Sequence, residues 1–303
     1  MLTRIPRSLH VGGGVSATNY TLAVSEFDVK GAGGGATAIL GMSALAADSA
    51  THVPCPIPTL PMPPLVTPEH YMLQAQLSPA LLSCALWTAY ENKALNAYYS
   101  KSAQGAFPLP LDTKDWALFV PALTAKYPNS PMDVNITFKS GAPPQLVASP
   151  SGGLTLHNLS TVFAFGVQSS ADAGSLRGGG GVSAGTPVFA LELTFDAGVD
   201  VSLVNEANPA TGEVGPALKF AVTSLSIKYS VASSSIGSIS TGGLQGLTNL
   251  LLPFVKDVIN VVGDIGFPLP ALGGLSFADS AIVIQQDALA INTNIKYSPT
   301  AAL

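Results

Sequence analysis

The sequence feature that most constrains the fold is a long segment of period-two hydrophobicity, FALELTFDAGVDVSLV, residues 189 to 204. Its apolar side chains fall on odd positions, whereas Glu, Thr, Asp and Ser fall on even ones. One phase held over about fifteen residues predicts a single strand, about three times the ordinary length. A strand this long must twist and curve, as strands do when a sheet wraps into a barrel.

Other segments follow the same pattern. Residues 132 to 139, MDVNITFK, and the run 289 to 297 alternate in the same way. In ALKFAVTSLSIKY, residues 217 to 229, the apolar phase slips between Val222 and Leu225. A slip of one residue predicts a β-bulge that bends the strand.

Three segments predict helices. In the first, Ser78 is the expected N-cap and Pro79 the first helical residue before LLSCALWTAY. In the second, a broken helical segment, Pro121 is expected to begin a short helix. The third, residues 242 to 262, is apolar on nearly every side. Burial of each aliphatic side chain is worth roughly 1.5 kcal/mol or more, so this helix must lie inside a curved sheet. The predicted fold class is α+β, a highly twisted antiparallel sheet wrapped as a barrel around long apolar helices.

Composition excludes several classes of partner. Only 10% of the 303 residues are charged, the net charge is −5, and the 13 basic residues are scattered, so no nucleic-acid partner is expected. The mean hydropathy is high at +0.40. No 18-residue stretch is free of charge or of strand-like alternation, so no transmembrane span is expected.

The N-terminus has no apolar core of the kind found in a signal peptide. Cys55 and Cys84 allow at most one disulfide, and buried or free thiols are the simpler expectation for both. Three sequons point weakly to the secretory route and give the glycosylation candidates Asn19, Asn135 and Asn158.

Two motifs of catalytic or cofactor-binding proteins occur in the wrong context. GVSAG around Ser183 matches a nucleophile elbow, but no strand precedes it and no helix follows it. Gly31, Gly33 and Ala36 match a dinucleotide fingerprint, but the chain leaves no room for the second parallel strand. A hairpin loop and a glycine turn between antiparallel strands are the expected structures.

The titratable residues form no evident catalytic set. The histidines His10, His52, His70 and His157 have no metal-ligand spacing and no acidic companion in the sequence. Glu192, Asp196 and Asp200 lie on the outer side of one predicted strand and are expected to be solvated. The sequence therefore predicts neither an enzyme nor a metal site, and no cofactor.

From about Tyr20 to Tyr297 the chain resembles the C-terminal half of the bactericidal/permeability-increasing protein family, which includes lipopolysaccharide-binding protein and the plasma lipid transfer proteins. The resemblance rests on the proline-rich segment 51 to 68, on LSPALLSCALWTAY, and on the signatures KYPN, APPQL and GFPLP in register. It implies two barrels joined by a central sheet, each with an apolar pocket for the acyl chains of a phospholipid, and an extracellular or secretory location.

The chain departs from this family at its beginning. Residues 1–50 are expected to be a remnant of the N-terminal half with strands of the central sheet, 51–68 a proline-rich connector, and 69–303 the C-terminal lipid-binding barrel. The cationic tip that binds lipid A lies in the missing barrel, so that activity does not carry over. The chain is expected to be a fragment or a truncated product.

The leading hypothesis is a lipid-binding module that holds phospholipid or another amphipathic lipid, with a role in lipid transfer or innate defence and contact with membrane surfaces. The alternative is a structural or interaction module of the same fold without lipid. The candidate lipid-binding residues come from the first and third helices: Leu81, Leu82, Leu86, Leu247, Leu251, Phe254 and Val258.

Overall fold

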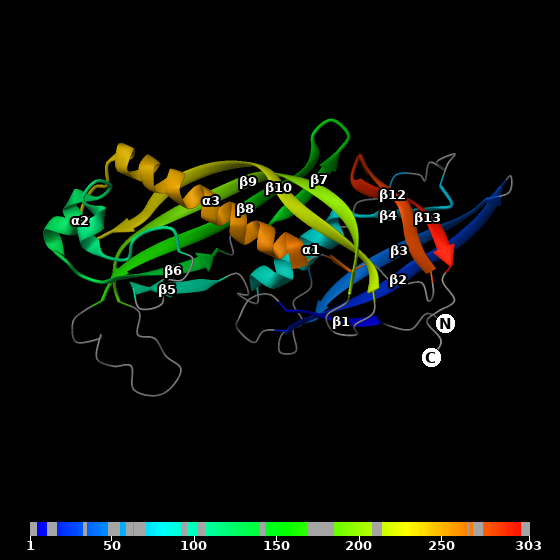
Figure 1. Ribbon diagram of the computed structural model, residues 1–303, viewed down its shortest axis with the longest axis horizontal. Helices are drawn as coiled ribbons and strands as arrows, with labels where there is room; N and C mark the ends of the chain where they lie inside the picture. Colours follow the sequence, from blue (N-terminus) through cyan, green and yellow to red (C-terminus); the bar gives the residue numbers. More distant parts are fainter. Residues whose placement is uncertain are drawn as a thin grey trace.

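The computed structural model describes residues 5–10, 17–32, 35–47, 55–58, 63, 71–91, 96–101, 107–139, 143–168, 185–207, 214–265, 267–268 and 275–297, the first three of these ranges by their backbone alone. Three antiparallel sheets and a few helices make up these ranges (Figure 1). The strands are β1 (Ile5–His10), β2 (Ala17–Ala32), β3 (Gly35–Ala47), β4 (Leu73–Leu77), β5 (Ala97–Ser100), β6 (Met132–Phe138), β7 (Gln145–Ser149), β8 (Gly153–Val167), β9 (Thr186–Ala207), β10 (Val214–Ser234), β11 (Phe267–Pro268), β12 (Leu275–Gln285) and β13 (Ala288–Tyr297). The helices are α1 (Pro79–Glu91), the 3-10 helix η2 (Thr113–Trp116), α2 (Pro121–Lys126) and α3 (Thr241–Ile265).

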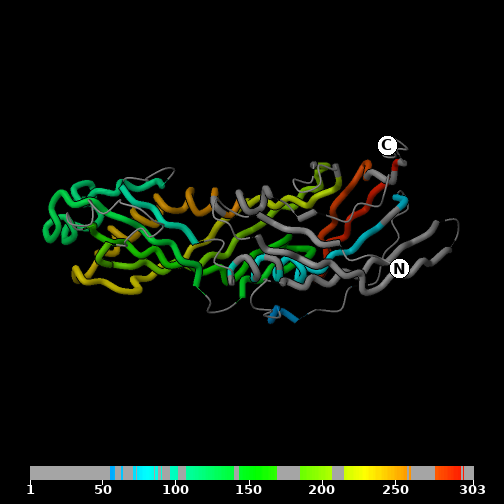
Figure 2. Tube along the Cα trace, turned by 90° about the horizontal axis from the view of Figure 1, so that it is seen from below, coloured from blue at the N-terminus to red at the C-terminus, as the bar shows by residue number. Residues whose placement is uncertain are grey.

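The largest sheet has the order β11-β10-β9-β8-β6-β5, and β7 pairs with β8 beside it. A second sheet has the order β12-β13-β4 and a third the order β1-β2-β3. Figures 1 and 2 place the small sheet of β12, β13 and β4 at one end of an elongated molecule and α2 at the other. The twisted antiparallel sheet that the sequence predicts is therefore confirmed.

Strand β9 has 22 residues and forms the centre of the large sheet. Its odd residues from Phe189 to Val199 are buried on the face that carries α3, called the inner face below. Both neighbouring strands carry irregularities in their register with β9, at Leu156/Leu159 in β8 and at Val222/Ser224 in β10. The second is the bulge that the phase slip predicts.

Helix α3 lies across the inner face and connects the two sides of the curled sheet. On one side, the Asn260 Oδ1 atom accepts a hydrogen bond from the Val222 backbone N–H of β10 at 2.8 Å. On the other, the Phe254 ring packs edge-on against Tyr99 of β5 and against Phe107, with ring centroids 5.9 and 5.5 Å apart. The helix contains an internal proline, Pro253, which has no N–H to donate to a carbonyl of the preceding turn. Pro253 is exposed, so water can donate to that carbonyl instead.

The end of the sheet near α2 is filled with aromatic side chains. Trp116 of η2 packs edge-on against Phe165 of β8 and Phe189 of β9, and all three are at most 1% exposed. The Trp116 Nε1–H donates to the Pro110 carbonyl at 2.7 Å, so the buried indole is satisfied. This end is a packed hydrophobic core.

Helix α1 begins as the sequence predicts, because the Ser78 Oγ atom accepts from the Ala80 backbone N–H at 3.2 Å. Ser83 joins this helix to β7: its hydroxyl donates to the Pro79 carbonyl and accepts from the Leu146 N–H, each at 2.8 Å. Pro121 is the first residue of α2, which is also as expected.

The two cysteines form a disulfide, Cys55–Cys84, with Cα atoms 5.5 Å apart. The expectation of free or buried thiols is therefore wrong. The partners are separated by 29 residues, and no spacing rule connects a cysteine in a proline-rich segment with one in a helix. The bond fixes the proline-rich segment to α1.

The glycine-rich segment that resembles a dinucleotide fingerprint connects two antiparallel strands. Gly31 of β2 pairs with Ala36 of β3, so the chain reverses between them, as expected. The elbow-like sequence around Ser183 lies outside the described residues.

The disulfide gives a first prediction. Because it closes a loop of about 30 residues, its removal should lower the free energy of unfolding by about 3 kcal/mol. Thermal unfolding measured with and without a thiol reductant should show a midpoint several degrees lower when reduced. A Cys55→Ala/Cys84→Ala variant should be insensitive to the reductant. Equal midpoints for the wild-type protein in both buffers would contradict this role.

A second prediction concerns Tyr98 of β5. Burial and a 2.8 Å hydrogen bond from its hydroxyl to the Asp133 carboxylate raise the pKa of Tyr98 to about 12. In the unfolded chain a tyrosine loses its proton near pH 10. Below about pH 10, Tyr98 makes its full contribution to the free energy of unfolding. As the pH rises from about 10 toward 12, this contribution is lost, because the unfolded chain releases the phenol proton first.

Tyr98→Phe removes this titration. Between about pH 9 and pH 12 the wild-type protein should lose about 1 kcal/mol more stability than the variant, after allowance for partial solvent screening. Urea unfolding at a series of pH values measures the difference. Parallel stability curves for the two proteins would show that the phenol does not contribute.

Candidate functional site

The seven residues proposed from the sequence differ in their exposure. Leu81 and Leu82 of α1 are 5% and 4% exposed, and Leu247 and Leu251 of α3 are fully buried at 0%. These four side chains belong to the continuous hydrophobic core. Their main contribution is therefore to stability.

Leu86 of α1 and Phe254 of α3 are only partly buried and pack against the edge of that core. The seventh residue, Val258, lies in α3, but its side chain is outside the described set. The structure thus joins six of the candidates in one apolar cluster and leaves two of them accessible.

The inner face of β9 is buried at one end and accessible at the other. From Phe189 to Phe195 the inward side chains are at most 1% exposed. Exposure then rises to 9% at Val199, and Val201 and Leu203 are partly exposed although they continue the same apolar phase. The sheet interior is therefore packed near α2 and becomes accessible toward the end near α1 (Figure 1).

Strand β10 and helix α3 add to this accessible surface. Phe220 of β10 is the register partner of Val201, and Leu203 pairs with Leu218. Ile259 of α3 adjoins Asn260, which holds the helix against β10. Val201, Leu203, Phe220 and Ile259 are all partly buried and apolar, and together they are called the open apolar end below.

The charged groups near this end belong to the opposite side of the sheet. Lys219 and Glu206 form an ion pair, and each lies on the phase of its strand opposite to the inward side chains: Lys219 lies between Leu218 and Phe220 of β10, and Glu206 is an even residue of β9. An apolar ligand at the open apolar end would thus meet hydrocarbon and the backbone of paired strands. The surface can bind alkyl chains, and it offers no group for acid or base catalysis among its four residues.

Sequence reasoning missed three members of this surface that lie on strands. These are Val201, Leu203 and Phe220. Periodicity indicates which face of a strand a side chain occupies, but not how well that face is covered. The available signal was their position at the end of the two longest strands, next to the connection between residues 207 and 214.

One expectation about titratable groups is wrong. His157 has an acidic companion, since its Nδ1 atom lies 2.9 Å from the Asp196 Oδ1 atom on the neighbouring strand. The two residues are 39 positions apart, so local spacing could not reveal the pair. In the described part of the chain, no group of three or more His, Cys, Asp or Glu side chains is arranged to hold a metal ion.

Asp112 lies by the packed end, directly before η2. The Lys101 ammonium, 2.6 Å from its Oδ2 atom, lowers the pKa of Asp112, against the opposing effect of burial. This pair is remote from the open apolar end and is structural. None of the helices that are described is long and apolar enough to cross a membrane.

Comparisons with known proteins found a curated relative and a solved structure that resemble this chain. A curated relative, the bactericidal permeability-increasing protein of Sebastes schlegelii, is 23% identical over 229 residues, which are 75% of this chain and 43% of the relative. The chain thus spans less than half of that relative's length. Among solved structures, the crystal structure of lipopolysaccharide binding protein matches with a TM-score of 0.46 and 18% identity, over 96% of this chain and 57% of the other.

The family comparison covers most of the molecule. The model of the LBP / BPI / CETP family, C-terminal domain, matches residues 43–297, which include α1, the whole of the large sheet and α3. The match contains every residue of the open apolar end. The chain therefore belongs to the LBP / BPI / CETP family, through the C-terminal domain of that family.

Proposed function

We propose that this chain binds a lipid and holds its acyl chains at the open apolar end, between β9, β10 and the C-terminal half of α3. The observation that carries the proposal is the rise in exposure along the inner face of β9. A strand that continues its apolar phase into a partly exposed region leaves hydrocarbon in contact with water. Acyl chains laid on Val201 and Leu203 would remove that contact.

The ligand class follows from the chemistry of this surface. It is apolar, lies next to strands whose backbone groups are paired, and has its charges on the other face, so it suits long alkyl chains more than a polar solute. Phospholipid is the proposed ligand, since membership of the family supports a lipid and the open apolar end suits its acyl chains. Lipid transfer and contact with a membrane surface belong to the same proposal.

Of the seven residues first suggested, Leu86 and Phe254 are the ones we propose to contact lipid directly. Their partial exposure supports this. Leu81, Leu82, Leu247 and Leu251 are buried core residues and would act by stabilising the fold. Val258 is proposed from its place on α3 between Phe254 and Ile259.

The location and division of the chain are part of the proposal. A disulfide such as Cys55–Cys84 persists in oxidising compartments, which supports an extracellular or secretory location. The sequon residues Asn135 and Asn158 are exposed and suit glycosylation there. We retain residues 1–50 as a remnant of an N-terminal half with strands of the central sheet, 51–68 as a connector, and 69–303 as the lipid-binding unit.

One observation favours a second candidate function, that of a structural or interaction module without lipid. Leu247 and Leu251, chosen as ligand contacts, are completely buried in protein. If side chains also cover the open apolar end in solution, the fold would serve as a scaffold. Organic extraction of the purified protein followed by mass spectrometry separates the two, because only a lipid-binding protein releases a stoichiometric lipid.

The third prediction tests the surface directly. Leu203→Asp places a carboxylate where the acyl chain would lie, and burial of an unpaired charge in hydrocarbon costs several kcal/mol. Uptake of a fluorescent phospholipid should be weakened by more than tenfold. The milder variant Leu203→Ser should show an intermediate loss.

The matched control is Leu118→Asp, because Leu118 is 84% exposed in the turn between η2 and α2. It makes the same chemical change at the opposite end of the sheet and should leave lipid uptake unchanged. Circular dichroism and the unfolding midpoint of each variant show that the fold is retained. Equal lipid uptake by Leu203→Asp and Leu118→Asp, or no co-purifying lipid and no uptake at all, would contradict the proposal.

A further inference from the structure

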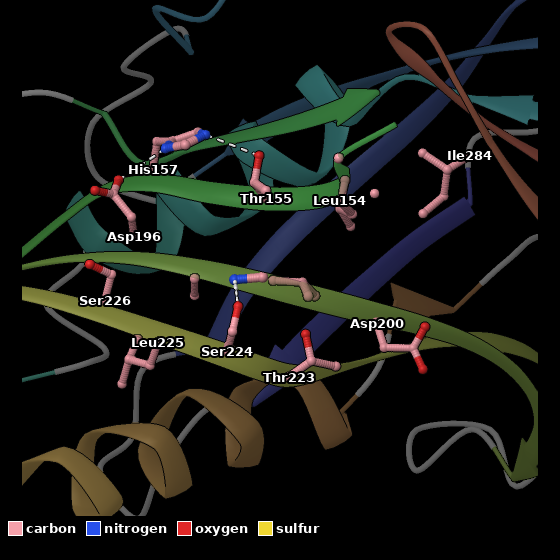
Figure 3. A pocket seen from close by; sticks show the side chains of 15 residues that line it. Leu154, Thr155, His157, Asp196, Asp200, Thr223, Ser224, Leu225, Ser226 and Ile284 are labelled. Carbon is pink, nitrogen blue, oxygen red and sulfur yellow. Dashed lines mark hydrogen bonds and ion pairs between the residues drawn. The ribbon is translucent and has the colours of Figure 1, made fainter. Parts of the chain in front are cut away.

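A concave site lies on the outer face of the large sheet, whereas the open apolar end lies on the inner face. It has a volume of about 550 Å³ and is lined by β8, β9 and β10, by the β7–β8 turn, and by Ile284 of β12. Figure 3 shows polar side chains from three adjacent strands directed into the same space. This site is called the polar groove below.

The groove exists because of an irregularity on each side of Gly198. The register shift at Leu156/Leu159 lies on the β8 side of β9, and the one at Val222/Ser224 lies on the β10 side. Gly198 itself has no side chain, and a Cβ atom placed there would lie 2.5 Å from the Ser224 Oγ atom. The glycine thus leaves the floor of the groove open, and its N–H donates to that hydroxyl at 3.2 Å.

The walls carry both donors and acceptors. The His157 ring is held between two partners, with Nδ1 2.9 Å from Asp196 Oδ1 and Nε2 3.0 Å from the Thr155 hydroxyl. Asp200 uses one carboxylate oxygen to accept from the Val201 N–H at 2.9 Å, which fixes its orientation. The second oxygen of each carboxylate is available to accept hydrogen bonds from a ligand.

The charge of the lining excludes anions as ligands. The groove is lined by two carboxylates and by no Lys or Arg among the described residues, so phosphate, sulfate and anionic lipid headgroups would be repelled. The lining is also unsuited to a metal ion. Asp196 and Asp200 are four residues apart on one strand, which places them about 13 Å apart, whereas carboxylate oxygens bind cations at about 2.0–2.6 Å.

The remaining chemistry matches a neutral ligand with several hydroxyl groups. Hydroxyl side chains such as Thr223, Ser224 and Ser226 can donate and accept at the same time, as can the vicinal hydroxyls of a sugar. Ile284, which is partly exposed, provides hydrocarbon against which the C–H face of a sugar ring can pack. The two carboxylates are separated by about the length of two linked rings.

We propose that the polar groove is a carbohydrate-binding site for a neutral disaccharide or the end of a longer neutral glycan. Asp196 and Asp200 would accept hydrogen bonds from ring hydroxyls at its two ends, and Ser224 would bind near the middle. His157 is a positioning residue that holds the Asp196 carboxylate toward the groove. This site is separate from the proposed lipid surface and does not depend on it.

Saturation-transfer difference NMR on the purified chain, with maltose, lactose and cellobiose as probes, tests the site. At least one disaccharide should receive saturation, with a dissociation constant of roughly 1 mM by titration, as expected for an open, shallow groove. Asp196→Asn/Asp200→Asn should weaken that binding at least tenfold. Both side chains lie on the outer face of β9, so the fold should be retained.

Glu192→Gln is the matched control. Glu192 lies on the same face of the same strand as Asp196 and forms a comparable ion pair, with Lys139 at 2.9 Å, but it does not line the groove. It should leave disaccharide binding unchanged. Absence of saturation transfer to all three sugars, equal binding by the double variant, or competition by inorganic phosphate would each overturn the proposal. Removal of bound lipid should have no effect on sugar binding.

Discussion

The contact of α3 with both sides of the curled sheet is the interaction on which the rest of the molecule depends. A single antiparallel sheet with one apolar face is stable only when that face is covered. Asn260 holds the helix to β10, and Phe254 holds it to Tyr99 of β5 and to Phe107. The twist of the long strands brings these two sides close enough for one helix to reach both.

The packing under α3 divides the interior into two parts with different properties. Near α2, the rings of Trp116, Phe165 and Phe189 fill the space between the sheet and the helical segments. Toward α1, the same apolar phase of β9 continues after the aromatic residues have ended, with the smaller side chains of Val199 and Val201. The change from large rings to branched aliphatic residues along one strand accounts for a packed core in one part and partly exposed apolar side chains in the other.

Periodicity in the sequence was enough to predict the sheet, the bulge near Thr223 and the beginnings of α1 and α2, because each depends on residues close together in the chain. Features that combine distant residues could not be predicted in this way. The Cys55–Cys84 bond, the His157–Asp196 pair and the exposure of Leu203 all depend on how separate elements pack. The sequence placed the candidate residues on α1 and α3, while the strand residues of the open apolar end emerged only from the structure.

The free edge of β10 has a consequence for the behaviour of the protein at high concentration. Among the described strands, β11 pairs with β10 only at Ala217 and Leu218, so most of a 21-residue strand could template the addition of another chain. Two register irregularities, at Val222/Ser224 and Val231/Ser233, interrupt that edge, and Pro268 lacks a donor at its one paired stretch. Such interruptions prevent a second chain from pairing along the full length of the β10 edge. The long strand can therefore cover the sheet interior without promoting aggregation.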